Sequence, residues 1–348
     1  MFDAPDTATQ AMQTFFTPHQ VQQVAQALVP AIGLEPAMGA GASRLGGVPE
    51  LPEGTPWPRP DLPADIETIA KRGNPDAAAQ MRAHLEKRLP LAFIGQVDLA
   101  EARALGEVAE PLPSQGRLLF FYDLSVGPWE SGTRVARVMW VDAPAAALQP
   151  LAMPADLVDA AQVEARMHED IRREFNEPAP GVPQGTNYGA PARPVSLKAG
   201  WGVPDPASVE MARLPALQAY YRGESQDAAA EGFAESYDEM RESLDLAYPA
   251  QGWKRHQLLG SPSPEQDDPR YQAVITTEFG EEFLDRETWK RERSRIFTQA
   301  QEWRLLLQVD LADWSGGALG EGTVYFVIRH DDLAAHRFDR VVAVYQQT

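Results

Sequence analysis

The chain has 348 residues, of which 44% are hydrophobic, so it can bury the core of one large domain or two ordinary ones. Its 50 acidic residues outnumber 31 basic ones, and the net charge of −19 argues against binding to nucleic acid or anionic membranes. The absence of cysteine excludes disulfides, thiolate catalysis and Cys-ligated metals.

The amino terminus, MFDAPDTATQ, lacks the basic segment and apolar core of a signal peptide. No run of 18 apolar residues is present, so no membrane span is expected. We therefore expect a soluble cytoplasmic protein. No motif indicates a cofactor or a metal site.

The first predicted element is a helix over 18–32, with Thr17 as its cap and Pro18 at its first position. A loop rich in Gly and Pro follows over 43–58 (SRLGGVPELPEGTPWP). The next helix is expected to begin at Asn74 and Pro75 and to run towards Arg88.

Three strands are predicted next, at 93–99 (FIGQVDL), at 116–122 (GRLLFFY) and around 134–138. In the first of them, simple alternation places Phe93, Gly95, Val97 and Leu99 on one face. The whole segment thus indicates a unit made of a loop, a helix and three strands.

The remaining elements begin with a long amphipathic helix over 154–176. A Pro- and Gly-rich loop then spans 177–206, with a short strand at 195–198, and residues 207–246 are expected to be helical. The last predicted elements are a helix at 281–300 and strands at 305–311, 322–328 and 340–344.

The chain also repeats itself, because the pentapeptide QVDLA occurs at 96–100 and again at 308–312. Three further anchors occur in the same order at nearly constant separation. They are Leu45, Gly47 and Pro49 with Leu258, Gly260 and Pro262; Gly116 and Phe120 with Gly322 and Phe326; and Arg134, Val135 and Val138 with Arg340, Val341 and Val344. We interpret the pattern as an ancient duplication of the loop-helix-three-strand unit.

The predicted fold is therefore α+β, with two related halves and a mostly helical insertion between them. Residues 1–42 form an N-terminal helix and approach loop, and 43–142 form the first repeat. Residues 143–255 form the helical insertion and linker, and 256–348 form the second repeat.

Several of these stretches also resemble the signature of the YwqG-like family. They are Gly46, Gly47, Pro49, Leu51, Pro52, Trp57 and Pro58; Gln96–Leu99; the aromatic strand at 118–122; HQLLGSP at 256–262; and VYFVIRHDDLAAHRFDRV at 324–341. The similarity covers nearly all of 43–348. It implies an α+β fold with a duplication, in bacterial proteins of unknown function, and it transfers no catalytic residue.

The repeat places two polar pairs at matching positions, Gln96 with Asp98 and Gln308 with Asp310. If symmetry brings these pairs together, the four side chains can line a ligand site, and two close carboxylates can act as acid and base or hold a hard cation. The alternative is that each aspartate caps a short helix, since Glu101 and Asp313 follow three residues later.

Two other groups of residues have similar alternatives. Trp57 can stack on a sugar or a base in a groove, or it can close the core. Glu164 and His168 lie one helical turn apart and can ligate a metal, but no third ligand is evident, so an ordinary ion pair is expected.

Residues 224–245 hold eight acids and one base, Arg241, on predicted helix. Such a surface either serves solubility or faces a basic partner. The acids singled out for partner binding are Glu231, Glu235, Asp238, Glu239 and Glu242.

Three classes of function remain. The first is a non-enzymatic interaction protein that covers a basic protein, as an immunity protein covers a toxin. The second is a binding protein for a small molecule or sugar in a cleft between the halves, lined by Gln96, Asp98, Gln308, Asp310 and Trp57. The third is a hydrolase that uses the paired carboxylates. We predict the first, without a cofactor, and we keep the other two as alternatives.

Overall fold

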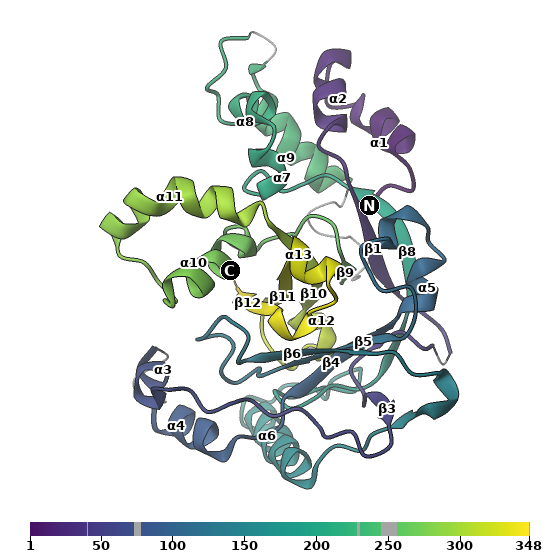
Figure 1. The fold of residues 1–348 in the computed structure, drawn as a ribbon, viewed down its shortest axis with the longest axis vertical. Helices are drawn as coiled ribbons and strands as arrows, with labels where there is room; N and C mark the ends of the chain where they lie inside the picture. Colours follow the sequence, from purple (N-terminus) through teal and green to yellow (C-terminus); the bar gives the residue numbers. More distant parts are fainter. Residues whose placement is uncertain (40, 73–77, 228–229, 245–255, 348) are drawn as a thin grey trace.

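The structure is a computed structural model that describes residues 1–39, 41–72, 78–227, 230–244 and 256–347. Its α+β fold is built on one antiparallel ten-stranded sheet, with the strand order β12-β11-β10-β9-β1-β8-β2-β4-β5-β6 (Figure 1). The strands are β1 (Val29–Pro36), β2 (Arg44–Leu45), β4 (Ala92–Asp98), β5 (Arg117–Tyr122), β6 (Ala136–Val141), β8 (Arg193–Gly202), β9 (Gln257–Leu258), β10 (Trp303–Asp310), β11 (Thr323–Arg329) and β12 (Val342–Gln346). A separate pair joins β3 (Glu50–Pro52) to β7 (Leu148–Pro150).

The sheet curls nearly into a barrel, so its two ends approach each other. The rings of Phe120 and Phe326, from β5 and β11, meet inside with centroids 5.3 Å apart. In the loop between β5 and β6, the backbone of Gly132 exchanges hydrogen bonds of 2.9 and 3.1 Å with the backbone of Ala343 in β12. One hydrophobic core therefore includes residues of both predicted halves.

The two predicted halves occupy mirrored places about the β1–β8 pair. The segment β4-β5-β6 forms one end of the strand order and β10-β11-β12 forms the other. The matched glycines also have similar roles. Gly47 and Gly260 both have positive φ, and an added Cβ would lie only 2.7 Å and 2.5 Å from the Cβ atoms of Ala192 and Ala31. This geometry is consistent with the repeat, which remains an inference about ancestry.

The predicted alternation of side chains is wrong in the two QVDL strands, because each of them contains a β-bulge. The register shifts between Phe93 and Gly95 in β4, and between Leu305 and Leu307 in β10. Phe93 therefore packs in an outer cluster, whereas Val97 belongs to the inner core. Simple alternation fails because a bulge adds one residue to one strand and turns the following side chains over.

The two central strands also differ from the prediction. The helix expected over 18–32 ends at Ala25, and β1 begins four residues later. Pro30 disfavours continuation of the helix, and the β-branched Val29 and Ile32 favour the strand, which pairs along its full length with β8. That partner covers ten residues rather than the four expected at 195–198.

The helices are α1 (Pro5–Met12), α2 (Pro18–Ala25), α3 (Ile66–Arg72), α4 (Ala78–Lys87), α5 (Leu99–Arg103), α6 (Ala155–Glu174), α7 (Val209–Ala212), α8 (Pro215–Tyr221), α9 (Phe233–Ser243), α10 (Pro269–Phe279), α11 (Arg286–Ala300), α12 (Leu311–Trp314) and α13 (His330–Ala334). The helix predicted at 281–300 is α11, capped by Asp285. The predicted cap at Asn74 and Pro75 lies outside the described residues. No helix of the described part is long and apolar enough to cross a bilayer.

Five helices form a unit of their own at the top of Figure 1: α1, α2, α7, α8 and α9. Its core contains Phe16, Phe233 and Tyr237, and the rings of Phe16 and Phe233 stack with centroids 5.2 Å apart. The N-terminal helices therefore pack against the helices of the insertion, which the sequence partition had kept separate.

A buried ion cluster connects this helical unit to the second half. Arg270 of α10 is fully buried and binds the carboxylates of Asp268, at 2.6 Å, and of Glu210 in α7, at 2.5 and 2.6 Å. Burial opposes the charged form of Glu210, but the charge and hydrogen bonds of Arg270 outweigh it and hold the pKa of Glu210 below its ordinary value.

We predict that Arg270→Ala will lower the free energy of unfolding by about 3–5 kcal/mol, because it leaves two buried carboxylates without their cation. Arg295→Ala removes an arginine that pairs with Glu278 near the surface and will cost less than about 1 kcal/mol. Urea denaturation measures both. Equal losses for the two variants would contradict the assignment.

The same cluster predicts a dependence on pH. Because the pKa of Glu210 is lowered in the folded state, its contribution is present at neutral pH and is lost as the pH falls through the folded pKa. Glu210→Gln will therefore make the unfolding free energy less sensitive to acid than in the wild type. Denaturation curves recorded between pH 7 and pH 3 will test this, and identical pH profiles would refute it.

Candidate functional site

Both predicted aspartates cap short helices. Asp98 Oδ1 accepts hydrogen bonds from the backbone N–H groups of Ala100 and Glu101, at 3.0 and 3.1 Å, at the start of α5. Asp310 Oδ1 accepts one from Asp313, at 2.7 Å, at the start of α12. The capping alternative thus describes the local geometry of both.

Their glutamine neighbours hold the two opening loops in place. Gln96 Oε1 accepts from the backbone N–H of Glu50, and Gln308 Oε1 accepts from that of Ser263, both at 3.0 Å. Each glutamine is buried. Each glutamine therefore fixes the opening loop of its own half, at Glu50 and at Ser263.

Trp57 lies in the core of the first half. It is buried, its indole N–H donates to the carbonyl of Leu91 at 2.8 Å, and its ring meets the edge of Phe121 at 5.8 Å. The side chain covers the outer face of β5.

In each half, one polar side chain bridges the capping aspartate and the acidic residue three positions later. In the first half, Ser43 Oγ accepts from the Asp98 N–H at 2.9 Å and donates to Glu101 at 2.5 Å. In the second, His256 accepts from the Asp310 N–H at Nδ1 and donates from Nε2 to Asp313, at 2.6 Å. The imidazole thus connects the backbone of the cap to Asp313.

A second candidate site is a cleft of about 1710 Å³, which we call the inter-half cleft. Residues of both predicted halves and of the insertion line it. They include Arg72, His84 and Trp129 from the first half, Glu164, His168 and Tyr188 from the insertion, and Gln272, Glu282 and Phe283 from the second half. Its lining residues come in part from α3, α4, α6, α10 and α11, which occupy the left and the lower part of Figure 1.

One wall carries an imidazole oriented by a carboxylate. His84 Nε2 in α4 lies 3.1 Å from Asp123 Oδ1, just after β5. Asp123 is buried, and the same oxygen accepts from the backbone N–H groups of Ser125 and Val126 at 3.2 Å. The Tyr188 ring lies 6.3 Å from the imidazole. Burial raises the pKa of Tyr188, against a hydrogen bond from Ser125.

One buried carboxylate, Glu164, and one half-buried carboxylate, Glu282, reach the cleft with mainly neutral partners. Glu164 in α6 accepts from the backbone and side chain of Asn187, at 3.2 and 2.9 Å, and lies 3.6 Å from His168. Glu282 accepts from the backbone and hydroxyl of Ser131, and Arg72 lies 3.9 Å away. Burial raises the pKa of both carboxyl groups.

This arrangement can recognise a ligand through hydrogen bonds and charge. Within the described residues, no hydroxyl is hydrogen-bonded to His84. The same residues contain no group of three side chains suited to hold a metal ion.

Sequence reasoning missed this cleft because its residues have no common spacing. His84, Ser125 and Tyr188 come from a helix, a turn after a strand and a loop. The one available signal was the pairing of Glu164 with His168 along a helix. It was interpreted as a solvated ion pair, although Glu164 is only 8% exposed.

We predict that Asp98→Ala and Asp310→Ala will each lower the free energy of unfolding by about 1 kcal/mol, because each removes a helix cap. The double variant will show an additive loss, within about 0.5 kcal/mol, since the caps have no partner in common. Asp310→Asn keeps an acceptor oxygen and will lose less. A large coupling energy in the urea double-mutant cycle would instead support a shared carboxylate site.

Comparison with known proteins provides one family. No protein of curated function matches the chain. A family model described as "Domain of unknown function (DUF1963)" matches residues 43–346, which include every strand of the sheet except β1 and leave out α1 and α2. The chain therefore belongs to the DUF1963 family.

Proposed function

We propose that the protein is a non-enzymatic binding protein whose ligand occupies the inter-half cleft. The observation that carries the proposal is that three separate parts of the chain build one cleft and direct hydrogen-bonding side chains and aromatic rings into it. Buried carboxylates with few cationic partners are costly for stability, and they are expected where a ligand completes their environment.

The same geometry favours binding over hydrolysis. His84 and Asp123 form an oriented base, but no reacting group of the described residues stands next to it. A hydrolase that uses Asp98 and Asp310 gains no support, because both carboxylates accept local backbone N–H groups.

The proposal is tested by placing a large side chain on one wall of the cleft, so that it blocks ligand binding. Ala83 and Ala79 are exposed alanines one turn apart on α4, and of the two only Ala83 lines the cleft. We expect a library of small organic fragments, screened by saturation-transfer NMR, to yield ligands of the wild type. Ala83→Trp will abolish their signals, whereas Ala79→Trp will leave them intact. Fragments that bind both variants equally would place the site elsewhere.

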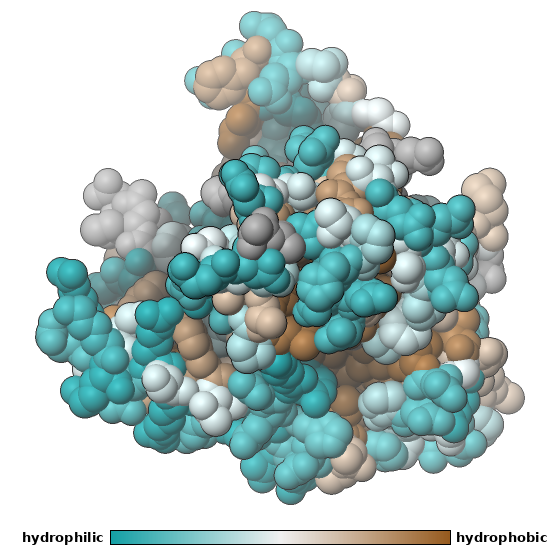
Figure 2. Space-filling model, turned by 90° about the horizontal axis from the view of Figure 1, so that it is seen from above, coloured by the Kyte–Doolittle hydropathy of each residue, from teal (hydrophilic) through white to brown (hydrophobic). Residues whose placement is uncertain are grey.

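A second candidate function is binding of a basic protein at the acidic face of α9, as an immunity-like protein would do. Glu231, Glu235, Asp238, Glu239 and Glu242 are all exposed. The one base of the segment, Arg241, instead pairs with Asp205 at 2.8 Å. Figure 2 looks down on this end of the molecule and shows a largely hydrophilic surface.

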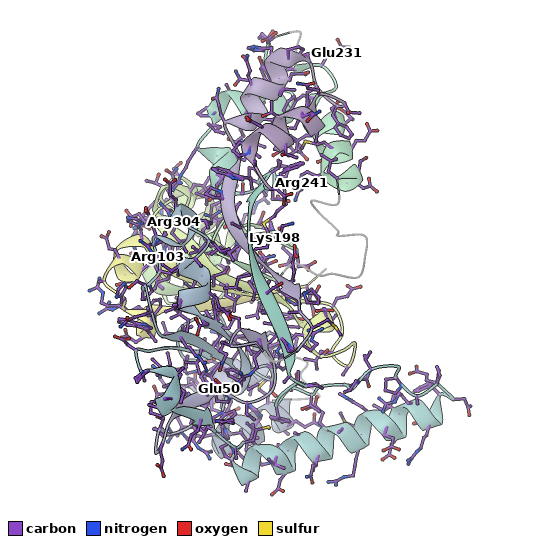
Figure 3. All side chains as sticks on the ribbon, turned by 90° about the vertical axis from the view of Figure 1, so that its right-hand side faces the viewer. Glu50, Arg103, Lys198, Glu231, Arg241 and Arg304 are labelled. Carbon is purple, nitrogen blue, oxygen red and sulfur yellow. The ribbon has the colours of Figure 1, made fainter. Side chains whose placement is uncertain are left out.

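This second surface is distinct from the cleft, since Glu231 and α6 lie at opposite ends of the molecule (Figure 3). We expect a pull-down from native cells to recover a basic protein that salt releases. Replacing Glu235, Asp238 and Glu239 by lysine will abolish capture. Lysine at Glu86, Glu107 and Glu110 changes the charge equally at other exposed positions and will not. Capture that survives the first set of changes would exclude this surface.

Three further proposals rest on sequence alone. They are a cytoplasmic location, no binding to nucleic acid, and kinship with the YwqG-like proteins of bacteria.

A further inference from the structure

We infer that the occupant of the inter-half cleft is a basic, amphipathic segment of another polypeptide, which packs along α6 and enters the cleft. This inference rests on the proposed function and adds the chemical class of the ligand.

The first observation is an exposed apolar stripe on α6. Four apolar side chains recur at every fourth position along this 20-residue helix, and the last of them lies one residue beyond its end. They are Val163 (60% exposed), Met167 (52%), Ile171 (44%) and Phe175 (68%). Residues four apart share one face of a helix. Single exposed apolar side chains are normal, but a contiguous stripe with polar flanks indicates an interaction surface.

The second observation is that the stripe continues into the cleft. Val163 and Met167 line the cleft, as do the exposed rings of Trp129 and Phe283. Figure 3 shows α6 extending from the base of the molecule beyond its other elements. The stripe runs from Val163 to Phe175 and is therefore about 18 Å long at about 1.5 Å per residue, so a ligand that covers all of it is longer than a typical metabolite.

The volume of the cleft leads to the same conclusion. Sites for small molecules usually enclose about 300–1,000 Å³. The inter-half cleft, at about 1710 Å³, exceeds that range. An amphipathic helix that lies in an apolar groove is a common mode of peptide recognition, and its side chains at every third or fourth position would match the spacing of the stripe.

The third observation is charge. Of the acidic residues that line the cleft, Asp268 is neutralised by Arg270 and Asp156 by Arg59. Asp159, Glu164, Asp267 and Glu282 remain, against two basic side chains, Arg72 and Lys87.

The net charge of the whole chain, −19, adds to the attraction for a basic segment. It also disfavours the two other occupants of an apolar helix face. A second copy of this chain carries the same negative charge, and anionic lipid repels an acidic surface.

The experiment uses an 18-residue fluorescent peptide made of leucine and lysine, with leucine at the apolar positions of a helix. Fluorescence anisotropy will show binding that weakens as salt is added. A peptide with glutamate in place of lysine, and one with glutamine in place of leucine, will each bind at least about tenfold more weakly, because each lacks one of the two attractions. Equal binding of all three peptides would overturn the inference.

Matched variants locate the site. Met167→Ser combined with Ile171→Ser removes exposed apolar groups from the stripe and will weaken the leucine–lysine peptide about tenfold. Leu62→Ser changes an apolar side chain that is 50% exposed away from the cleft and will have no effect. Wild-type affinity in the Met167/Ile171 variant would also overturn the inference.

The outcomes separate this inference from the proposed function. If fragments occupy the cleft and Ala83→Trp blocks them, but the leucine–lysine peptide does not bind, the function stands and the peptide inference fails. If neither binds, both fail. Self-association in sedimentation that Met167→Ser abolishes, or flotation with vesicles of phosphatidylcholine and phosphatidylglycerol, would assign the stripe to another occupant and overturn the inference.

Discussion

The pairing of β1 with β8 is the interaction on which the rest of the structure depends. Eight residue pairs connect the two strands, from Val29 with Gly202 to Pro36 with Val195. Each strand also borders one end of the sheet, because β1 pairs with β9 and β8 pairs with β2. Without this central ladder, the ends of the sheet would have no common frame, and the curl that brings Phe120 onto Phe326 would not form.

Closure of the sheet explains why a cleft exists where it does. The loop of the β5–β6 hairpin contacts the second half through the backbone bridge from Gly132 to Ala343 and the hydrogen bonds from Ser131 to Glu282. The cleft lies beside this junction, and α4 and α6 form its other wall. The carboxylates of Glu164 and Glu282 therefore lie where two sheet ends and a helix meet. Ligands commonly bind at such junctions between structural elements.

The apolar side chains of α6 and the acidic side chains of α9 differ in the free-energy cost of their exposure to water. Exposed acids are well solvated, so α9 can keep its charge without a partner. Contact with water is unfavourable for exposed apolar side chains until a partner covers them, and this applies to Val163, Met167, Ile171 and Phe175. That difference makes the cleft and α6 the better-supported binding surface, although the acidic segment was the clearer feature of the sequence.

The sequence by itself determined the α+β class and both QVDL strands, and it offered helix capping by Asp98 and Asp310 as one of two alternatives, because these features depend on local propensity and short spacing. Tertiary structure alone decided three other matters. It turned residues 29–36 into a central strand, since β8 supplies the partner. It reversed the face of Phe93 through a bulge, and it assembled the cleft from residues such as His84, Glu164, Tyr188 and Glu282. Such contacts join residues far apart in the chain, and no local pattern encodes the closure of the sheet that creates them.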